Sequence, residues 1–229
     1  GWLQFAPLIF WAPMAVSYLN DTLVGVIAIV LSILVPMMPG MAHHMEMKKP
    51  GPLIPPGWTY NPSSWHQRAP MIGLAFVGWL ASRYLAAFQL GYITTIWDPF
   101  FGNGTMNVLH SDVSKAFPIS DAGLGAAAYT IEMLMGWMGG KERWRSMPWM
   151  VTFFFILVVP LGMVSITLII LQPLAVGSWC SVCLFTALVM LTMIPFAVDE
   201  VVATLQFLKR SVHEGKPLWR TFWAGVLRN

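Results

Sequence analysis

Long apolar stretches separated by short clusters of charge are the feature that most restricts how this chain can fold. A helix needs about 20 mostly apolar residues to cross roughly 30 Å of hydrocarbon. Only 10% of the 229 residues are charged, whereas a soluble domain carries about 25%, and the mean hydropathy is +0.65. The sequence therefore predicts an all-α polytopic membrane protein and leaves no room for a soluble domain of useful size.

The apolar stretches divide the chain into six expected membrane spans. They cover residues 3–18, 22–38, 71–93, 122–138, 149–171 and 180–205. We therefore expect an N-terminal transmembrane hairpin over residues 1–38, a linker over 39–69, a four-helix transmembrane bundle over 70–208 and an amphipathic tail over 209–229. The tail is expected to form a C-terminal interfacial helix, because its apolar residues recur at helical spacing. The same pattern would also suit a helix that binds a partner protein.

The distribution of basic residues predicts the orientation in the membrane, since cytoplasmic segments are enriched in Lys and Arg. Six alternating spans place most basic residues on one side, with Lys115 on the other and Arg83 inside a span. The linker 39–69 and the tail 209–229 are then cytoplasmic, as are both termini, in a bacterial inner membrane. Topology accounts for the net charge of +3, so we predict no nucleic-acid partner. The basic residues on the predicted inner side are Lys48, Lys49, Arg68, Lys141, Arg143, Arg145, Lys209, Arg210, Lys216, Arg220 and Arg228.

Two charged residues fall inside expected spans, where an isolated charge is costly. Arg83 lies about 18 Å from the inner end of its span, and Glu132 about 16 Å from the outer end of the next, at 1.5 Å per residue. Antiparallel neighbours would bring both residues to the middle of the bilayer. We predict a structural ion pair between them, with a proton route to a buried cofactor as the alternative.

The sequence Cys180-Ser-Val-Cys183 is the strongest candidate for chemistry. It lies at the outer end of the last span, where the helix dipole and free amides would stabilise a thiolate, and Ser178 is a candidate helix cap. The alternative is two small cysteines packed in a membrane helix. No metal site is predicted here, because zinc would need further ligands. A c-type haem would need a histidine after Cys183, where Leu184 stands.

Together these features resemble the vitamin K epoxide reductase family over roughly Met71 to Leu208. The family has a Cys-x-x-Cys pair opening the last helix of a four-helix unit and a long outer loop between its first two helices. The stretches that carry the resemblance are Val108-Leu109-His110-Ser111, Phe117-Pro118-Ile119, the run from Gly123 to Tyr129, and Trp179-Cys180-Ser-Val-Cys183.

The resemblance implies that electrons pass from protein thiols through cysteines to a quinone of the ubiquinone or menaquinone type. Cys180 and Cys183 would be the pair next to the quinone, and Ser111 the loop serine near the active centre. Asp121 stands where relatives often place an asparagine that hydrogen-bonds the quinone. Phe185 would line the pocket for the quinone ring.

One departure from the family concerns the outer loop. Relatives usually carry there a second cysteine pair that relays electrons from the partner protein, whereas Trp97 and Thr105 occupy the approximate positions here. The chain resembles a bacterial branch without this pair, so an external thiol would have to reach Cys180 or Cys183 directly. The N-terminal hairpin, with Trp11-Ala-Pro13 and Asn20-Asp21, resembles an SPW repeat.

The sequence thus favours a membrane thiol:quinone oxidoreductase-like protein with a redox-active disulfide. Its expected partners are membrane lipid, the quinone and a periplasmic thiol protein of thioredoxin fold. The first alternative is a non-catalytic subunit that retains the fold inside a larger membrane complex. The second is a copper-handling protein, because methionines and histidines gather in residues 37–47 and soft ligands suit copper.

Overall fold

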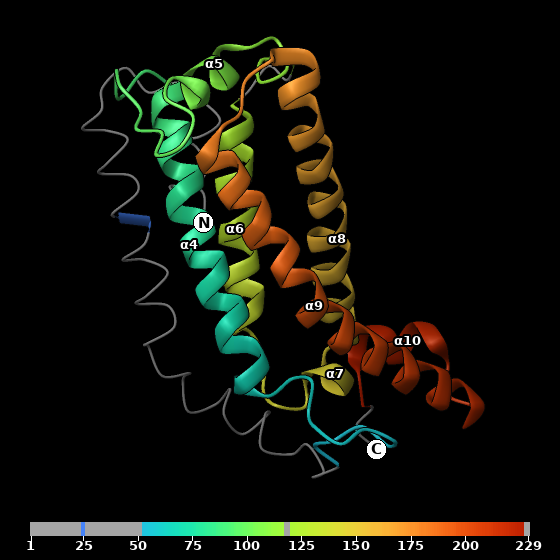
Figure 1. Ribbon diagram of the computed structural model, residues 1–229. Helices are drawn as coiled ribbons and strands as arrows, with labels where there is room; N and C mark the ends of the chain where they lie inside the picture. Colours follow the sequence, from blue (N-terminus) through green and yellow to red (C-terminus); the bar gives the residue numbers. More distant parts are fainter. Residues whose placement is uncertain (1–23, 26–51, 117–119, 227–229) are drawn as a thin grey trace. The chain divides into compact units, whose positions relative to one another are not determined.

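The computed structural model describes residues 24–25, 52–116 and 120–226, and the regular structure in these ranges is helical (Figure 1). The all-α prediction is confirmed. The elements are α4 (Trp65–Gln89), α5 (Gly104–His110), α6 (Asp121–Trp137), α7 (Arg143–Ser146), α8 (Pro148–Leu171), the π-helix η1 (Gln172–Val176), α9 (Ser181–His213) and α10 (Leu218–Ala224).

Three helices of the described part are long and apolar enough to cross a membrane: α4, α8 together with η1, and α9. Their bounds lie close to three of the expected spans. The fourth expected span of the bundle is α6, whose 17 residues reach about 26 Å, close to the lower limit for crossing. The prediction of a polytopic membrane protein is confirmed. The expected spans 3–18 and 22–38, and with them the N-terminal hairpin, lie outside the described residues except for Val24 and Gly25.

Helix α8 shows most clearly that the outward surfaces of the long helices face lipid. It is apolar all round, and its outward side chains include Ile156, Met163 and Ile170, each more than half exposed. Contiguous apolar surface of this kind is rare on soluble monomers. Pro160 lies inside α8, which membrane helices tolerate because neighbouring groups satisfy the freed backbone.

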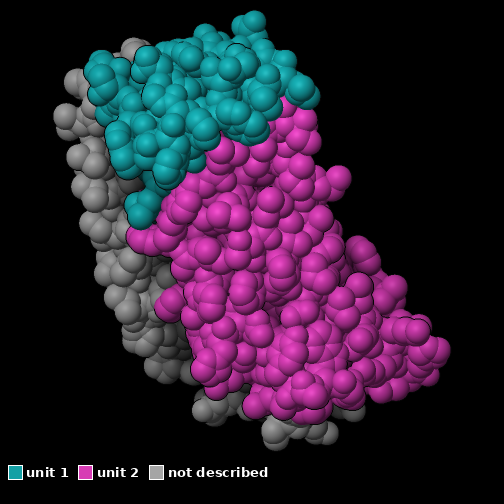
Figure 2. All heavy atoms as spheres, in the orientation of Figure 1, with its two compact units in different colours: residues 1–49, 80–127, 172–182 teal, residues 50–79, 128–171, 183–229 magenta. Residues whose placement is uncertain are grey.

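The chain divides into two compact units (Figure 2). The first contains residues 80–127 and 172–182 together with residues 1–49, and the second contains residues 50–79, 128–171 and 183–229. We describe each unit by itself.

Small residues allow close helix packing in the second unit. A Cβ atom on Gly78 of α4 would overlap the ring of Tyr129 on α6, and one on Gly136 would approach Ile72 Cγ1 to 2.9 Å. Because lipid gives no hydrophobic drive to helix association, membrane helices depend on such close contacts. Met150 and Val151 of α8 and Val201 of α9 form a buried cluster nearby.

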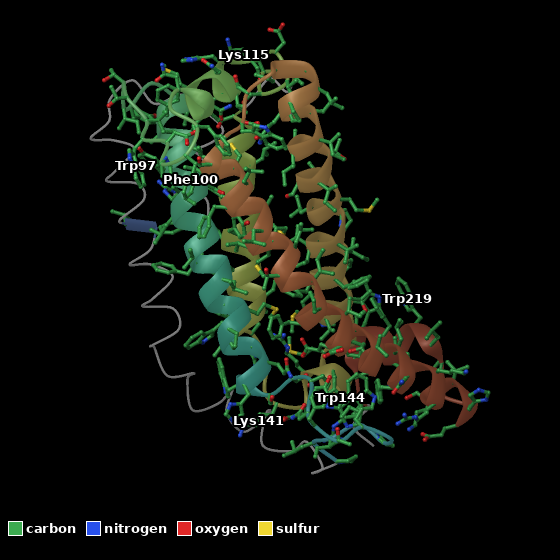
Figure 3. The ribbon with its side chains drawn as sticks, in the orientation of Figure 1. Trp97, Phe100, Lys115, Lys141, Trp144 and Trp219 are labelled. Carbon is green, nitrogen blue, oxygen red and sulfur yellow. The ribbon has the colours of Figure 1, made fainter. Side chains whose placement is uncertain are left out.

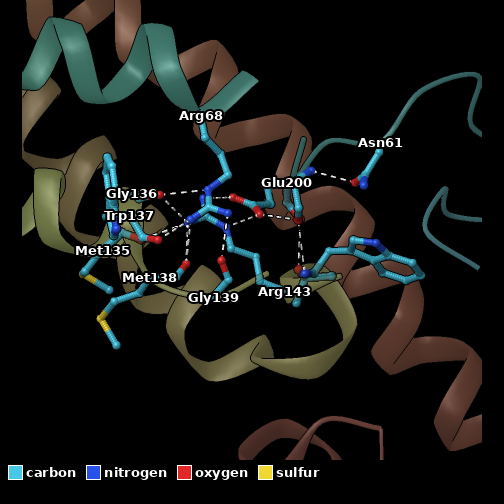
Figure 4. Close-up of polar contacts among 12 residues, drawn as sticks. Asn61, Arg68, Met135, Gly136, Trp137, Met138, Gly139, Arg143 and Glu200 are labelled. Atoms are coloured by element: carbon cyan, nitrogen blue, oxygen red, sulfur yellow. Dashed lines mark hydrogen bonds and ion pairs between the residues drawn. The ribbon is translucent and has the colours of Figure 1, made fainter. Parts of the chain in front are cut away.

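The C-terminal end of α6 is closed by the guanidinium group of Arg68 from α4 (Figure 4). Arg68 is 1% exposed and donates hydrogen bonds to the carbonyl oxygens of Gly136, Trp137, Met138 and Gly139. The last carbonyls of a helix have no partner within the helix. Arg68 therefore satisfies backbone groups that would otherwise be buried without a hydrogen bond.

Arg143 of α7 completes this cluster. It is also 1% exposed, and it donates to the carbonyl oxygens of Met135 and Gly136 at 2.8 and 3.0 Å. Its guanidinium forms a buried ion pair with Glu200 of α9, which also accepts a hydrogen bond from the Ser63 hydroxyl. The cluster thus joins four helices of the second unit.

Arg68 and Arg143 therefore have a structural role that the sequence analysis missed. From the sequence, both residues were expected in connecting segments and served only as indicators of orientation. Arg68 instead lies in α4, and both side chains are buried. The exposed basic residues of the described part still bear on orientation: Lys141, Lys209, Lys216 and Arg220 on the predicted inner side, and Lys115 on the other.

We predict that Glu200→Leu destabilises the protein by about 3–5 kcal/mol, because it leaves two buried guanidinium groups without a carboxylate. The matched control is Glu214→Leu, which removes an exposed ion pair with Lys216; such pairs contribute about 0–1 kcal/mol. Unfolding of both variants in the same detergent measures the difference. Equal losses of stability would show that the buried cluster does not hold the helices together.

Candidate redox site

Cys180 and Cys183 form a disulfide at the start of α9. Cys180 is fully buried and directly precedes the helix, and Cys183 is partly buried in its first turn. The expected position of the pair at the beginning of the last membrane helix agrees with the structure. The surroundings of the pair in the first unit come from the loop 97–103, from α5 and from the turn after η1.

Asp98 links the loop between α4 and α5 to the start of α9. Its Oδ2 accepts hydrogen bonds from the backbone amide and the hydroxyl of Thr105, at 2.9 and 2.6 Å. Its Oδ1 accepts a short hydrogen bond from the hydroxyl of Ser181, the first of the two residues between the cysteines. The Ser181 amide lies 3.5 Å from Oδ2. We call the group Asp98, Thr105 and Ser181 the Asp98 bridge.

The environment of Asp98 favours its charged form. Burial alone would favour the neutral acid, but the hydrogen bonds from Ser181 and Thr105 and from the amides of Phe101 and Phe100 outweigh this effect. Together they hold the pKa of Asp98 well below its usual value of 3.8. A negative charge therefore lies at the first turn of α9, where it interacts favourably with the helix dipole.

This charge alters the expectation for the cysteines. From the sequence, the helix dipole and free amides were expected to stabilise a thiolate. Asp98 now places a negative charge at the same helix end, and a nearby like charge disfavours a second anion. The Ser181 amide and hydroxyl are also engaged by Asp98, so they are not free to stabilise a thiolate.

The turn before Cys180 is fixed by Gln172, which is buried. Its side-chain oxygen accepts a hydrogen bond from the Cys180 amide at 2.9 Å. The predicted capping role of Ser178 is wrong, because α9 begins at Ser181 and the Ser178 hydroxyl instead accepts a hydrogen bond from Asn107 of α5. At the start of α5, a Cβ atom on Gly104 would overlap the carbonyl oxygen of Trp179, so only glycine allows this approach.

The positions that correspond to the loop cysteines of relatives differ from each other in the structure. Thr105 is fully buried within the Asp98 bridge, whereas Trp97 is 71% exposed. The loop is therefore held to the start of α9 by hydrogen bonds at one of these positions. Sequence reasoning missed Asp98; its position before Phe100 and Phe101 fits a local turn, but nothing in the spacing indicates the contact with Ser181.

Ser111 and Asp121 belong to one polar network in the first unit. Ser111 is the C-cap residue of α5. Its hydroxyl donates a hydrogen bond to the carbonyl oxygen of Val108 at 2.6 Å and accepts one from the Ser114 amide at 3.4 Å. The Ser114 hydroxyl lies 3.1 Å from both carboxyl oxygens of Asp121. Gln89 of α4 donates to Ser114 and to Asp121. Ser114 and Gln89 were not singled out from the sequence.

Phe185 lies near the start of α9, and its side chain is 44% exposed. The described residues contain no group of three or more His, Cys, Asp and Glu side chains that could hold a metal ion. The methionine- and histidine-rich segment 37–47, on which the copper alternative depends, lies outside the described ranges.

The predicted ion pair between Arg83 and Glu132 is wrong. Glu132 is 1% exposed, and neither of its carboxyl oxygens has a hydrogen-bond partner in the described part of the chain. The depth calculation placed both residues correctly within helices, but depth alone does not determine the direction in which a side chain points. The alternative, a role for Glu132 in proton transfer, stays a hypothesis.

Comparison with known proteins gives one match. The profile of the vitamin K epoxide reductase family matches residues 69–198, which is more than half of the chain. This range contains the Asp98 bridge, the disulfide and the network around Asp121. No curated protein and no solved structure matches the chain.

We predict that Asp98→Asn destabilises the loop at neutral pH, by about 1–3 kcal/mol, because an amide cannot accept all of these hydrogen bonds. The folded-state pKa is depressed, so the stabilisation from Asp98 is complete above the unfolded-state pKa of 3.8 and is lost as the pH falls below it. The difference in melting temperature between wild type and variant should therefore shrink in acid. Asp112→Asn, at an exposed carboxylate, is the control, and a difference independent of pH would contradict the prediction.

Proposed function

Because the chain belongs to the vitamin K epoxide reductase family, we propose that it is a membrane thiol:quinone oxidoreductase whose redox centre is the Cys180–Cys183 disulfide. Family membership supports a thiol:quinone-type oxidoreductase in general. The observation that carries the specific proposal is this disulfide at the start of an apolar helix, within the matched range.

The proposed reaction begins with thiol–disulfide exchange. A thiolate of a partner protein attacks one sulfur of the disulfide and displaces the other as a thiolate. A second thiol of the partner then resolves the mixed disulfide, so the partner is oxidised and Cys180 and Cys183 become a dithiol. The buried position of Cys180 favours attack at Cys183, which is partly exposed. Oxidation of the dithiol back to the disulfide releases two electrons and two protons.

A quinone of the ubiquinone or menaquinone type supplies the acceptor in this proposal, since it takes up two electrons and two protons to become a hydroquinone. Asp121 and Phe185 are the residues proposed to hold it, with Ser111 near the centre. A carboxylate accepts hydrogen bonds but cannot donate them, so Asp121 suits the hydroxyl groups of the reduced ring better than the carbonyl oxygens of the oxidised ring.

The thiol partner is proposed to be a periplasmic protein of thioredoxin fold. It has to reach the Cys180–Cys183 pair directly, because Trp97 and Thr105 replace the relay cysteines of relatives. This places the pair at the outer face of a bacterial inner membrane, with both termini cytoplasmic. We retain the division into a hairpin (1–38), a linker (39–69), a bundle (70–208) and a tail (209–229) as part of this proposal.

A non-catalytic role within a larger membrane complex is the second candidate. It is favoured by Thr105, which is fully buried and bonded to Asp98 where relatives carry a redox cysteine. In that case the Asp98 bridge would preserve the fold of the loop without any electron transfer through it.

We predict that the disulfide cycles between oxidised and reduced forms. Dithiothreitol should convert the purified protein to a form that reacts with an alkylating reagent, and a soluble quinone analogue should restore the unreactive form while being reduced. Quinone absorbance and gel shift of the alkylated protein measure both halves of the reaction. The Cys180→Ser/Cys183→Ser variant should show neither the gel shift after dithiothreitol nor the reduction of the quinone analogue. A dithiol that quinone does not oxidise would favour the non-catalytic role.

We also predict that the outer loop and the tail label from opposite sides of the membrane. In the Cys180→Ser/Cys183→Ser background, Asn103→Cys should react with a membrane-impermeant maleimide on intact cells, because residue 103 is exposed in the loop. His213→Cys, exposed at the end of α9, should react only after lysis. The reverse pattern would overturn the proposed orientation.

A further inference from the structure

Helix α10 packs against the beginning of the apolar helix α8. The rings of Trp223 and Trp149 are stacked with centroids 6.2 Å apart. Phe153, one turn further along α8, contacts Trp223 and Phe222 at 6.0 and 6.4 Å. At the end of α10, the amide of Val226 donates to the carbonyl oxygen of Arg145 in α7 at 3.0 Å. The position of α10 is thus fixed by both neighbouring helices of the second unit.

These contacts determine the depth of α10 in the membrane. The apolar run of α8 begins at Pro148, directly after the charged helix α7, which contains Arg143 and Arg145. The start of such a run marks the boundary between hydrocarbon and headgroups, where Trp and Tyr are enriched. Since α10 lies against the first two turns of α8, it lies at the level of the lipid headgroups.

One side of α10 exposes large apolar side chains. Trp219 is 74% exposed (Figure 3). Its ring contacts that of Trp223, with centroids 5.6 Å apart. Leu218 and Trp223 are 55% and 43% exposed. The indole group has an apolar ring and one polar N–H, so it suits a boundary with apolar chains on one side and water on the other.

The surface around α10 is also strongly basic. Residues 209–226 contain four basic side chains, Lys209, Arg210, Lys216 and Arg220, and the single carboxylate Glu214. Glu214 pairs with Lys216, which leaves a surplus of positive charge. Nearby, the buried Nε atom of Arg145 has no hydrogen-bond partner among the described residues. A surface of zwitterionic lipid has no net negative charge, so it would not neutralise the surplus of positive charge in residues 209–226.

We propose that α10 and these basic residues form a binding surface for the headgroups of anionic phospholipids in the leaflet where α10 lies. The aromatic side chains enter the boundary of that leaflet, and the basic side chains contact lipid phosphates. Depth, exposed aromatic surface and surplus charge support the same occupant independently. The binding does not depend on the redox state or on electron transfer at Cys180 and Cys183.

The full chain in nanodiscs tests this proposal. Wild type is prepared in phosphatidylcholine alone and in phosphatidylcholine mixed with phosphatidylglycerol, and the lipids retained after mild delipidation are counted by native mass spectrometry. Hydrogen–deuterium exchange of residues 209–226 is measured in the same discs. Wild type should retain phosphatidylglycerol preferentially, and this segment should be better protected when that lipid is present.

The variant Lys209→Gln/Arg220→Gln should lose phosphatidylglycerol occupancy by about fivefold for each basic residue removed, and added salt should weaken wild-type binding. The matched control is Lys115→Gln, which removes an exposed basic residue from the outer loop and should leave occupancy unchanged. Equal retention of both lipids by wild type, or an equal loss in the control, would overturn the proposal. Protection of α10 in phosphatidylcholine alone to the same extent would also overturn it, because it would show an aromatic anchor without charge selectivity.

Discussion

The carbonyl groups at the C-terminal end of α6 impose the constraint on which the second unit depends. A helix end away from water must satisfy these groups within the protein, and Arg68 and Arg143 do so from two other helices. Their positive charges then require a buried counter-charge, which Glu200 of α9 provides. Because lipid gives packed helices no hydrophobic advantage, this directional cluster determines which helix ends meet. Apolar contacts alone would leave that choice weakly specified.

In the first unit, the Asp98 bridge attaches a loop to a helix without a covalent bond. A long loop has to be fixed over the start of α9, and the Asp98 carboxylate does this by accepting from Thr105 and Ser181. In the proposed reaction, a disulfide at this place would be made and broken by thiol exchange. In the disulfide form these hydrogen bonds attach the loop to α9, and because none of the bonded groups is a thiol, we expect the same attachment when Cys180 and Cys183 are reduced.

The fold could be predicted from the sequence largely because hydropathy and charge act locally along the chain. The expected spans 71–93, 122–138, 149–171 and 180–205 overlap α4, α6, α8 and α9. The contacts of the site could not be predicted in the same way, since Asp98 and Ser181 are far apart in sequence, Asp98 belongs to no motif, and the Cys-x-x-Cys motif does not specify what Ser181 contacts. The mistaken pairing of Arg83 with Glu132 has the same origin: depth follows from helical rise, whereas the facing of a side chain depends on helix rotation. Family resemblance identified the cysteines but not their electrostatic surroundings.

The charge of Asp98 also bears on which redox chemistry suits this centre. A low-pKa thiolate is an efficient nucleophile and leaving group toward another disulfide. Transfer to a quinone requires two protons as well as two electrons, and a neutral dithiol carries both. At this helix start, Asp98 binds the Ser181 hydroxyl and amide and Gln172 binds the Cys180 amide, so these donors are not free to stabilise a thiolate. A centre built in this way suits the proposed transfer of protons and electrons to a quinone, which does not require a stabilised thiolate.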